Sequence, residues 1–139
     1  MPSDISPYFG NITLRWFANQ ADMPSRPAHL YLALFNGNPK GSGTEVGATI
    51  NATTPRQEIT FADLASGAAH LLTSSNAQDW GNSAGDATLS YVGVYDNATP
   101  GSGHLYWSKA VAGGAQAIKT GSSVKFGVGA TTFNIGSDV

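Results

Sequence analysis

The pentapeptide Gly81-Asn82-Ser83-Ala84-Gly85 has the G-x-S-x-G spacing of a hydrolase nucleophile elbow. In that motif a buried strand precedes the serine and a helix follows it, so that a strained turn exposes the hydroxyl. Here residues 76–79 are largely polar, and residues 86–91 have the alternation of another strand. Ser83 is therefore predicted to lie in a loop between strands, and we assign no catalytic residue and expect no enzymatic activity.

Histidine could supply a metal ligand or a general base, but the histidines of this chain are isolated. His29, His70 and His104 have no partner at i, i+4, no H-x-H pair and no neighbouring cluster of carboxylates. A tight metal site needs several such ligands converging on one point. The glycine-rich stretches 41–43 and 101–103 open no helix, so they lack the helix dipole that holds phosphate. The sequence thus predicts no metal and no cofactor.

Charged residues are scarce, at 12% of the chain, and the net charge is −2. Without a run of Lys and Arg, nucleic acid is not an expected partner. No stretch approaches the ~18 apolar residues of a membrane span, and the N-terminus MPSDISPYFGNITLRWF lacks the pattern of a signal peptide. The surface of Ser, Thr, Asn and Gly carries little charge repulsion. It suits a protein packed against others, although many monomeric β-proteins share it.

The elements that position these side chains begin with a helix expected at residues 7–18. Ser6 is a suitable N-cap, and Pro7 fits the first helical position because its missing N–H costs nothing there. Gly10 weakens the helix, which therefore needs to dock its aromatic face on its own domain or on a partner. The apolar residues of this segment recur at intervals of three and four and are Ile5, Tyr8, Phe9, Ile12, Trp16 and Phe17.

After the prolines at 24 and 27 the apolar period changes to two, which is typical of strands. About eight short strands are predicted, at 29–35, 56–61, 68–73, 91–95, 104–108, 117–119, 122–128 and 131–135. Short strands separated by turn residues favour an all-β, antiparallel β-sandwich of jelly-roll type, with a barrel as the alternative. At 139 residues the chain fits one domain, with an N-terminal segment at 1–26 and the sandwich at 27–139.

One face of each strand must turn inward, and the large residues at period two mark that face. The side chains predicted to be buried are Leu30, Leu32, Leu34, Val92, Val94, Leu105, Trp107, Phe126, Phe133 and Ile135.

The loop that follows the first strand, residues 36–46, has one Lys, one Glu and several small residues. We interpret it as a contact loop that takes the shape of a neighbouring protein and becomes ordered on contact. A solvated connection without a role is the alternative. Its candidate contact residues are Asn36, Asn38 and Lys40.

Several segments together resemble a family of small virion proteins of tailed bacteriophages, often labelled tail fibre proteins. The matching pieces are HLYLALF at 29–35, RQEITF at 56–61, YVGVYD at 91–96, LYW at 105–107 and the late hairpin from Gly121 to Ile135. Some members resemble capsid cement or decoration proteins of jelly-roll fold, and the chain resembles cement proteins such as that of a short-tailed Bordetella phage. The segment GATINATTP at 47–55 departs from the family pattern, which leaves its backbone path open.

This resemblance implies a structural protein that binds the outer capsid surface and cements the shell. The alternative is a tail-fibre or tail-tip module that binds a receptor on the host surface. The implied partners are the major capsid protein and copies of the chain itself, as a dimer or a trimer. The protein would be made in the host cytoplasm and end in the virion. Its candidate interface residues are Ile5, Tyr8, Phe9, Ile12, Trp16, Phe17, Asn36, Asn38 and Lys40.

Overall fold

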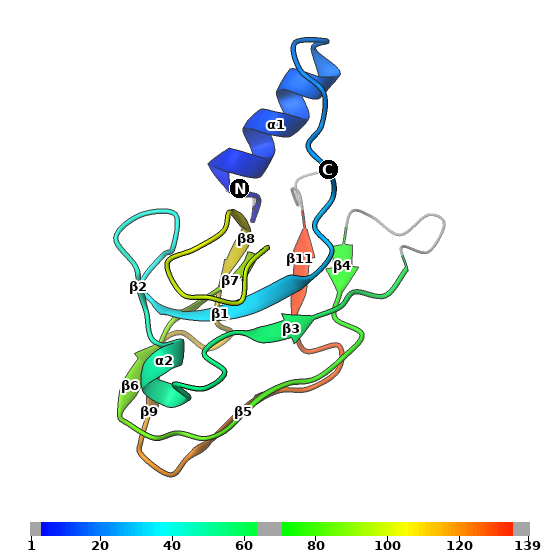
Figure 1. The fold of residues 1–139 in the computed structure, drawn as a ribbon. Coiled ribbons are helices and arrows are strands. Elements are labelled where there is room, and N and C mark those ends of the chain that lie inside the picture. The colour runs from blue at the N-terminus through cyan, green and yellow to red at the C-terminus, as the bar shows by residue number, and fades with distance from the viewer. Residues whose placement is uncertain (1–3, 64–70, 135–139) are drawn as a thin grey trace.

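The computed structural model describes residues 4–63 and 71–134 of the chain (Figure 1). His70 and Ile135, for which the sequence carried predictions, lie outside the described residues. In chain order the elements are α1 (Pro7–Phe17), β1 (Leu30–Asn36), β2 (Thr44–Glu45), α2 (Gly47–Ile50), β3 (Gln57–Ile59), β4 (Leu71–Thr73), β5 (Gln78–Asn82), β6 (Ala87–Leu89), β7 (Tyr91–Tyr95), β8 (Leu105–Ala110), β9 (Gln116–Ile118), β10 (Ser123–Phe126) and β11 (Thr132–Asn134).

The first layer is a sheet centred on β1, the most apolar strand of the chain. On one side β1 pairs with β7, which pairs in turn with β8. On its other side β1 pairs with β3 along its first half and with β2 at its end. All of these pairings are antiparallel. Both faces of β1 are covered at Leu32, Ala33, Leu34 and Phe35, which explains why this strand is continuously apolar.

The second layer comes from a two-stranded antiparallel ribbon that bends away from the hairpin of β7 and β8. Along this ribbon β6 pairs with β9, β5 with β10 and β4 with β11. The ladders continue one another, with Ala87 opposite Ile118 and Leu71 opposite Asn134. In Figure 1 the ribbon passes below the first sheet. The β7–β8 hairpin therefore lies in the first layer, and the other end of the ribbon, at β4 and β11, lies in the second.

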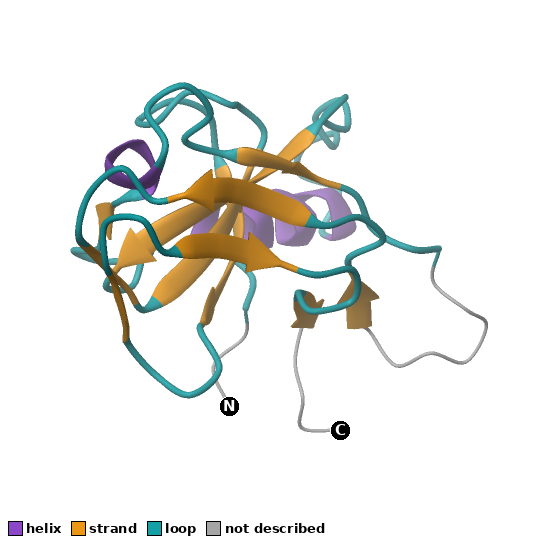
Figure 2. Cartoon of the chain, turned by 90° about the horizontal axis from the view of Figure 1, so that it is seen from below, coloured by secondary structure: helices purple, strands orange, loops and turns teal. Residues whose placement is uncertain are grey.

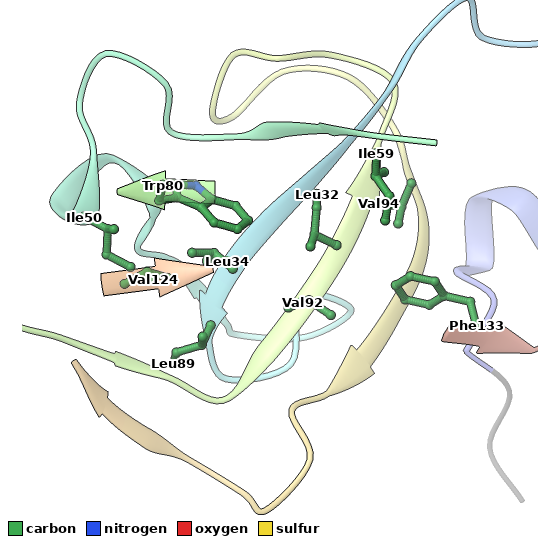
Figure 3. Close-up of a cluster of buried hydrophobic side chains, with 10 residues drawn as sticks. All are labelled: Leu32, Leu34, Ile50, Ile59, Trp80, Leu89, Val92, Val94, Val124 and Phe133. Atoms are coloured by element: carbon green, nitrogen blue, oxygen red, sulfur yellow. The ribbon is translucent and has the colours of Figure 1, made fainter. Parts of the chain in front are cut away.

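The core lies between these two layers (Figure 3). The first sheet contributes Leu32, Leu34, Val92 and Val94, and the ribbon contributes Trp80, Leu89, Val124 and Phe133. The predicted burial of Leu32, Leu34, Val92, Val94 and Phe133 is thereby confirmed. Leu30, Trp107 and Phe126 are partly buried and pack against the same cluster.

Leu105 was predicted to face this core, but it does not. The register between β7 and β8 shifts at Val94 and Tyr95, so β8 contains an extra residue and its alternation changes face. Leu105 instead lies over Gly93, where a Cβ would come within 2.9 Å of its Cδ1 atom. A bulge inverts the face of every residue on one side of it, which period-two reasoning cannot detect.

The all-β antiparallel sandwich with a short N-terminal helix is confirmed, and eleven strands are described where about eight were expected. Strand β5 was not predicted from the sequence, because Trp80 is its only large apolar residue and its neighbours are polar residues and glycine. Trp80 is buried, and its indole N–H donates to the carbonyl of Pro55 at 3.0 Å. The sequence also missed α2, a single turn in the segment whose path was left open.

Candidate protein interaction surface

The N-terminal segment is fixed to the outer edge of β8. Ile5 forms an antiparallel bridge with Trp107, and the Ser6 N–H donates to the Tyr106 carbonyl at 2.7 Å. The Ser6 hydroxyl accepts the N–H of Phe9 at 3.1 Å, which confirms the predicted N-cap, and it donates to the Leu105 carbonyl. One buried serine therefore both starts α1 and attaches it to the sheet.

The first half of α1 docks its aromatic rings on β8 and the residue before it. The Tyr8 ring stacks on His104 with centroids 4.1 Å apart and an interplanar angle of 9°. Phe9 packs against Tyr106 and Trp107, with ring centroids 5.3 Å and 4.8 Å apart. Tyr8 and Phe9, predicted as interface residues, thus serve to dock the helix on its own domain.

Asp96 supports this docking site from the loop after β7. Its Oδ1 accepts the backbone N–H of His104 at 2.7 Å, and its Oδ2 accepts the Tyr106 hydroxyl at 3.3 Å. Burial raises the pKa of the Asp96 carboxyl, but the hydrogen bonds from His104 and Tyr106 outweigh burial and hold the pKa below its usual value. Burial, with the Asp96 charge added, raises the pKa of Tyr106 well above 10. The ionised Asp96 carboxylate therefore accepts a hydrogen bond from the protonated Tyr106 hydroxyl over a wide pH range.

The second half of α1 extends beyond the sandwich, as Figure 1 shows, and none of its side chains is buried. In the view from below the helix lies behind the strands (Figure 2). We call residues 14–23, the end of this helix and the turn after it, the projecting tip. Its large apolar side chains are exposed: Leu14 by 66%, Trp16 by 55%, Phe17 by 81% and Met23 by 41%.

The turn of the projecting tip is well formed. The N–H groups of Ala18, Asn19 and Gln20 donate to carbonyls in the last turn of α1. Asn19 takes a left-handed conformation with φ 63°, which ends the helix and reverses the chain. A hollow of about 320 Å³ beside this turn is lined by Trp16, Asn19, Gln20, Ala21 and Asp22.

The loop at 36–46 is ordered by its own hydrogen bonds, so the expectation that it becomes ordered on contact is wrong. Its end pairs as β2 with the end of β1. The Asn38 carbonyl accepts the N–H groups of Gly41 and Gly43, each at 3.0 Å. Gly43 lies so close to Gly37 that a Cβ would come within 2.4 Å of the Gly37 carbonyl oxygen. Glycine is required here by close packing of the backbone.

Arg56 is the anchor of this loop, and sequence reasoning treated it as an ordinary strand residue. Its guanidinium is buried and makes a bidentate pair with Glu45, with both N–O distances 2.8 Å. It also donates to the carbonyls of Asn97 and Ser102 and lies 4.0 Å from the centroid of the Tyr95 ring. Burial raises the pKa of Tyr95, although the Arg56 charge opposes this. One side chain thus ties two loops to β3.

The predicted interface residues fall into two groups. Ile5, Tyr8 and Phe9 contact their own sheet, and Ile12 is partly buried. The Lys40 ammonium donates to the Ile5 carbonyl at 3.4 Å, which brings the loop to the base of α1. The residues left exposed are Trp16, Phe17, Asn36 and Asn38. Leu14 and Met23 join them and were missed: Leu14 lies on the side of α1 opposite the stripe formed by Phe9, Ile12 and Trp16, and Met23 follows the helix.

The described residues contain no group of three or more His, Asp or Glu side chains placed to hold a metal ion. Ser83 lies in the loop between β5 and β6, as predicted, and its buried hydroxyl donates to the Gly85 carbonyl at 2.6 Å. His29 is hydrogen-bonded to Glu58 at 3.1 Å. Neither helix of the described chain is long and apolar enough to cross a membrane.

One protein family matches almost the whole described chain. Its model, described as Podophage GP4 fiber I protein gp80, matches residues 4–134. No curated protein matches the chain.

Proposed function

We propose that this chain, which belongs to the Podophage GP4 fiber I protein gp80 family, is a non-enzymatic structural protein that binds the outer capsid surface and stabilises the shell. Membership in the family supports a structural role in a podophage virion. The observation that carries the proposal further is the projecting tip, which presents exposed apolar side chains on a helix anchored to a compact sandwich.

Such a tip is suited to contact with neighbouring virion proteins. Large aromatic and aliphatic side chains dominate the energy of protein interfaces, whereas an exposed Trp16 or Phe17 contributes little to the stability of a free domain. The exposed turn at Asn36 and Asn38 offers a second, polar contact. Many weak contacts acting together around a capsid would hold the protein firmly.

The word "fiber" in the family description favours a second candidate, a tail-fibre or tail-tip module that binds a host surface receptor. The number of copies in purified virions separates the two candidates. We expect a stain intensity that corresponds to one copy per major capsid subunit or a simple fraction of it. A few copies per virion, released with the tails, would instead support the tail module.

Binding to capsids that lack the protein tests the surface directly. Trp16→Ala should weaken binding by about 1–3 kcal/mol per contact, multiplied over copies, without changing the melting temperature. Lys119→Ala, a change at an exposed side chain of the ribbon, is the matched control and should bind normally. Equal binding by the Trp16 variant and the control would exclude the tip from the capsid interface.

The absence of catalysis is part of the proposal. Because the Ser83 hydroxyl is bonded to a backbone carbonyl, Ser83→Ala should change no esterase or protease activity. A wild-type activity that disappears in this variant would overturn the non-enzymatic role.

A further inference from the structure

The end of β1 carries the pair Asn36-Gly37, and no other Asn of the chain is followed by Gly. The backbone N–H that follows an asparagine can attack the carbonyl carbon of the side-chain amide. Glycine permits this attack most readily, because it has no Cβ to obstruct it. Asn36 is exposed, and none of the described residues forms a hydrogen bond with its side chain. The chain thus presents the pair most susceptible to this reaction at its surface.

The fold requires the glycine of this pair. Gly37 has φ 94°, a left-handed conformation that other residues rarely adopt. A Cβ on Gly37 would also lie only 3.1 Å from the Cα atom of Gly43. A larger residue at this position would slow the attack on Asn36, but it would strain the turn. The turn therefore needs another means of keeping the pair intact.

The attacking nitrogen is restrained by Ser90. The Gly37 N–H donates to the Ser90 hydroxyl oxygen at 2.7 Å. Ser90 is itself held in place, because its own N–H donates to the Phe35 carbonyl at 2.9 Å. Pairing of Asn36 with Thr44 keeps the strand backbone extended. Ring closure needs the nitrogen to turn toward the Asn36 side chain, so it requires this hydrogen bond to open.

We propose that Asn36-Gly37 is a latent deamidation site that the hydrogen bond to Ser90 protects. When the turn opens, the Gly37 nitrogen forms a bond to Cγ of Asn36, and the C–N bond of the side-chain amide breaks. The proton of the attacking N–H leaves with the amide nitrogen as ammonia. Water then opens the resulting succinimide ring at either carbonyl, which gives aspartate or isoaspartate. The rate is therefore set by the population of the open turn.

Either product changes the exposed polar contact at the start of the loop. Aspartate replaces a neutral side chain with a carboxylate and adds one negative charge to a net charge of −2. Isoaspartate also lengthens the main chain at residue 36. The pairing with Thr44 and the close packing of Gly37 on Gly43 then cannot both persist. Deamidation would thus alter this surface irreversibly, whichever partner the protein binds.

Incubation of the purified full-length protein in mildly alkaline buffer tests the site, because base removes the proton of the attacking nitrogen. Trypsin releases residues 16–40 as one peptide, in which mass spectrometry follows Asn36 and Asn38 together. Asn38 is an internal control, because Pro39 has no N–H with which to form the ring. We expect Asn36 to be lost slowly in the folded protein and much faster in denaturant, with Asn38 unchanged in both.

Three variants separate protection by Ser90 from general stability. Ser90→Ala removes the acceptor and should speed the loss of Asn36 about two- to tenfold, the factor expected when one hydrogen bond no longer holds the turn closed. Ser90→Thr keeps a hydroxyl and should stay near the wild-type rate. Val124→Ala weakens the core on the ribbon and should leave the rate at Asn36 unchanged.

Each of the following results would overturn the assignment. Loss of Asn36 in the folded wild type as fast as in denaturant would show that the turn is not restrained. Equal rates in the wild type and Ser90→Ala would remove the role of Ser90. Acceleration by Val124→Ala as large as that by Ser90→Ala would show that global unfolding, rather than opening of the turn, exposes the site.

Discussion

The loop at 36–46 and the helix α1 each differ from what their sequences suggest: the loop is firmly held, and half of the helix is exposed. The loop is rich in glycine and polar residues, yet it is closed by β2 and anchored by the buried Arg56. The helix has the regular apolar pattern of an element that packs on its own core, yet only its first half does so. Whether a segment packs thus depends on partners distant in the sequence. Glu45 and two backbone carbonyls hold Arg56 and with it the loop, whereas none of the described residues covers Phe17.

This difference suggests where each region acts. A loop that is already ordered loses little entropy when a partner binds, so Asn36 and Asn38 are presented in fixed positions. A helix end with exposed aromatic rings has apolar surface still to bury. The loop is suited to define geometry, and the tip is suited to supply binding energy.

The largest effect is expected for the loop anchor. Arg56→Ala should lower the free energy of unfolding by about 3–5 kcal/mol, because it leaves Glu45 and two carbonyls without their partner in a largely buried site. Thermal and urea unfolding measure the loss. Hydrogen exchange should show that the Gly43 amide loses its protection.

Ser42→Ala, at an exposed side chain, is the matched control in the same loop and should change stability by less than about 0.5 kcal/mol. If Arg56→Ala were as mild as this control, the loop would be held by its backbone alone.

The docked half of the helix should show an intermediate effect. Phe9→Ala removes contacts with Tyr106 and Trp107 in a partly buried site and should cost about 1–3 kcal/mol of stability. Thermal unfolding, together with Trp fluorescence as a report on Trp107, measures this change. An unchanged melting temperature with weaker association would mean that Phe9 serves a partner after all.

A smaller, pH-dependent effect is expected at Asp96. Its folded-state pKa lies below the usual value, so its contribution to stability is present above that value and is lost as the pH falls through the folded pKa. Asp96→Asn should therefore be less stable than the wild type at about pH 7, and the difference should shrink below about pH 3. Unfolding curves at both pH values test the sign. A difference that grows on acidification would contradict the assignment.

The smallest effect on stability is expected at the end of the tip. Phe17→Ala should change the free energy of unfolding by less than about 0.5 kcal/mol, because the side chain is 81% exposed. The contrast with Phe9→Ala is the sharpest test of the division within α1. Similar losses in the two variants would show that the helix is supported along its whole length.

Local physical chemistry explains how much could be predicted. Ser6 and Pro7 specified the start of α1, and alternating large side chains specified β1 and β7, because these signals act within a few residues. The core positions Leu32 and Val94 followed from the same alternation. The all-β class was determined by the sequence alone.

Tertiary structure decided the remaining features. A bulge turned Leu105 to the opposite face, and the burial of Trp80 depended on the Pro55 carbonyl, which is far away in the chain. The order of the loop depended on Arg56 meeting Glu45, and the exposure of Trp16 depended on where the sheet ends beneath α1. Apolar spacing along a helix shows which side chains share a face. Whether anything lies opposite that face is decided by segments distant in the sequence, which no local pattern encodes.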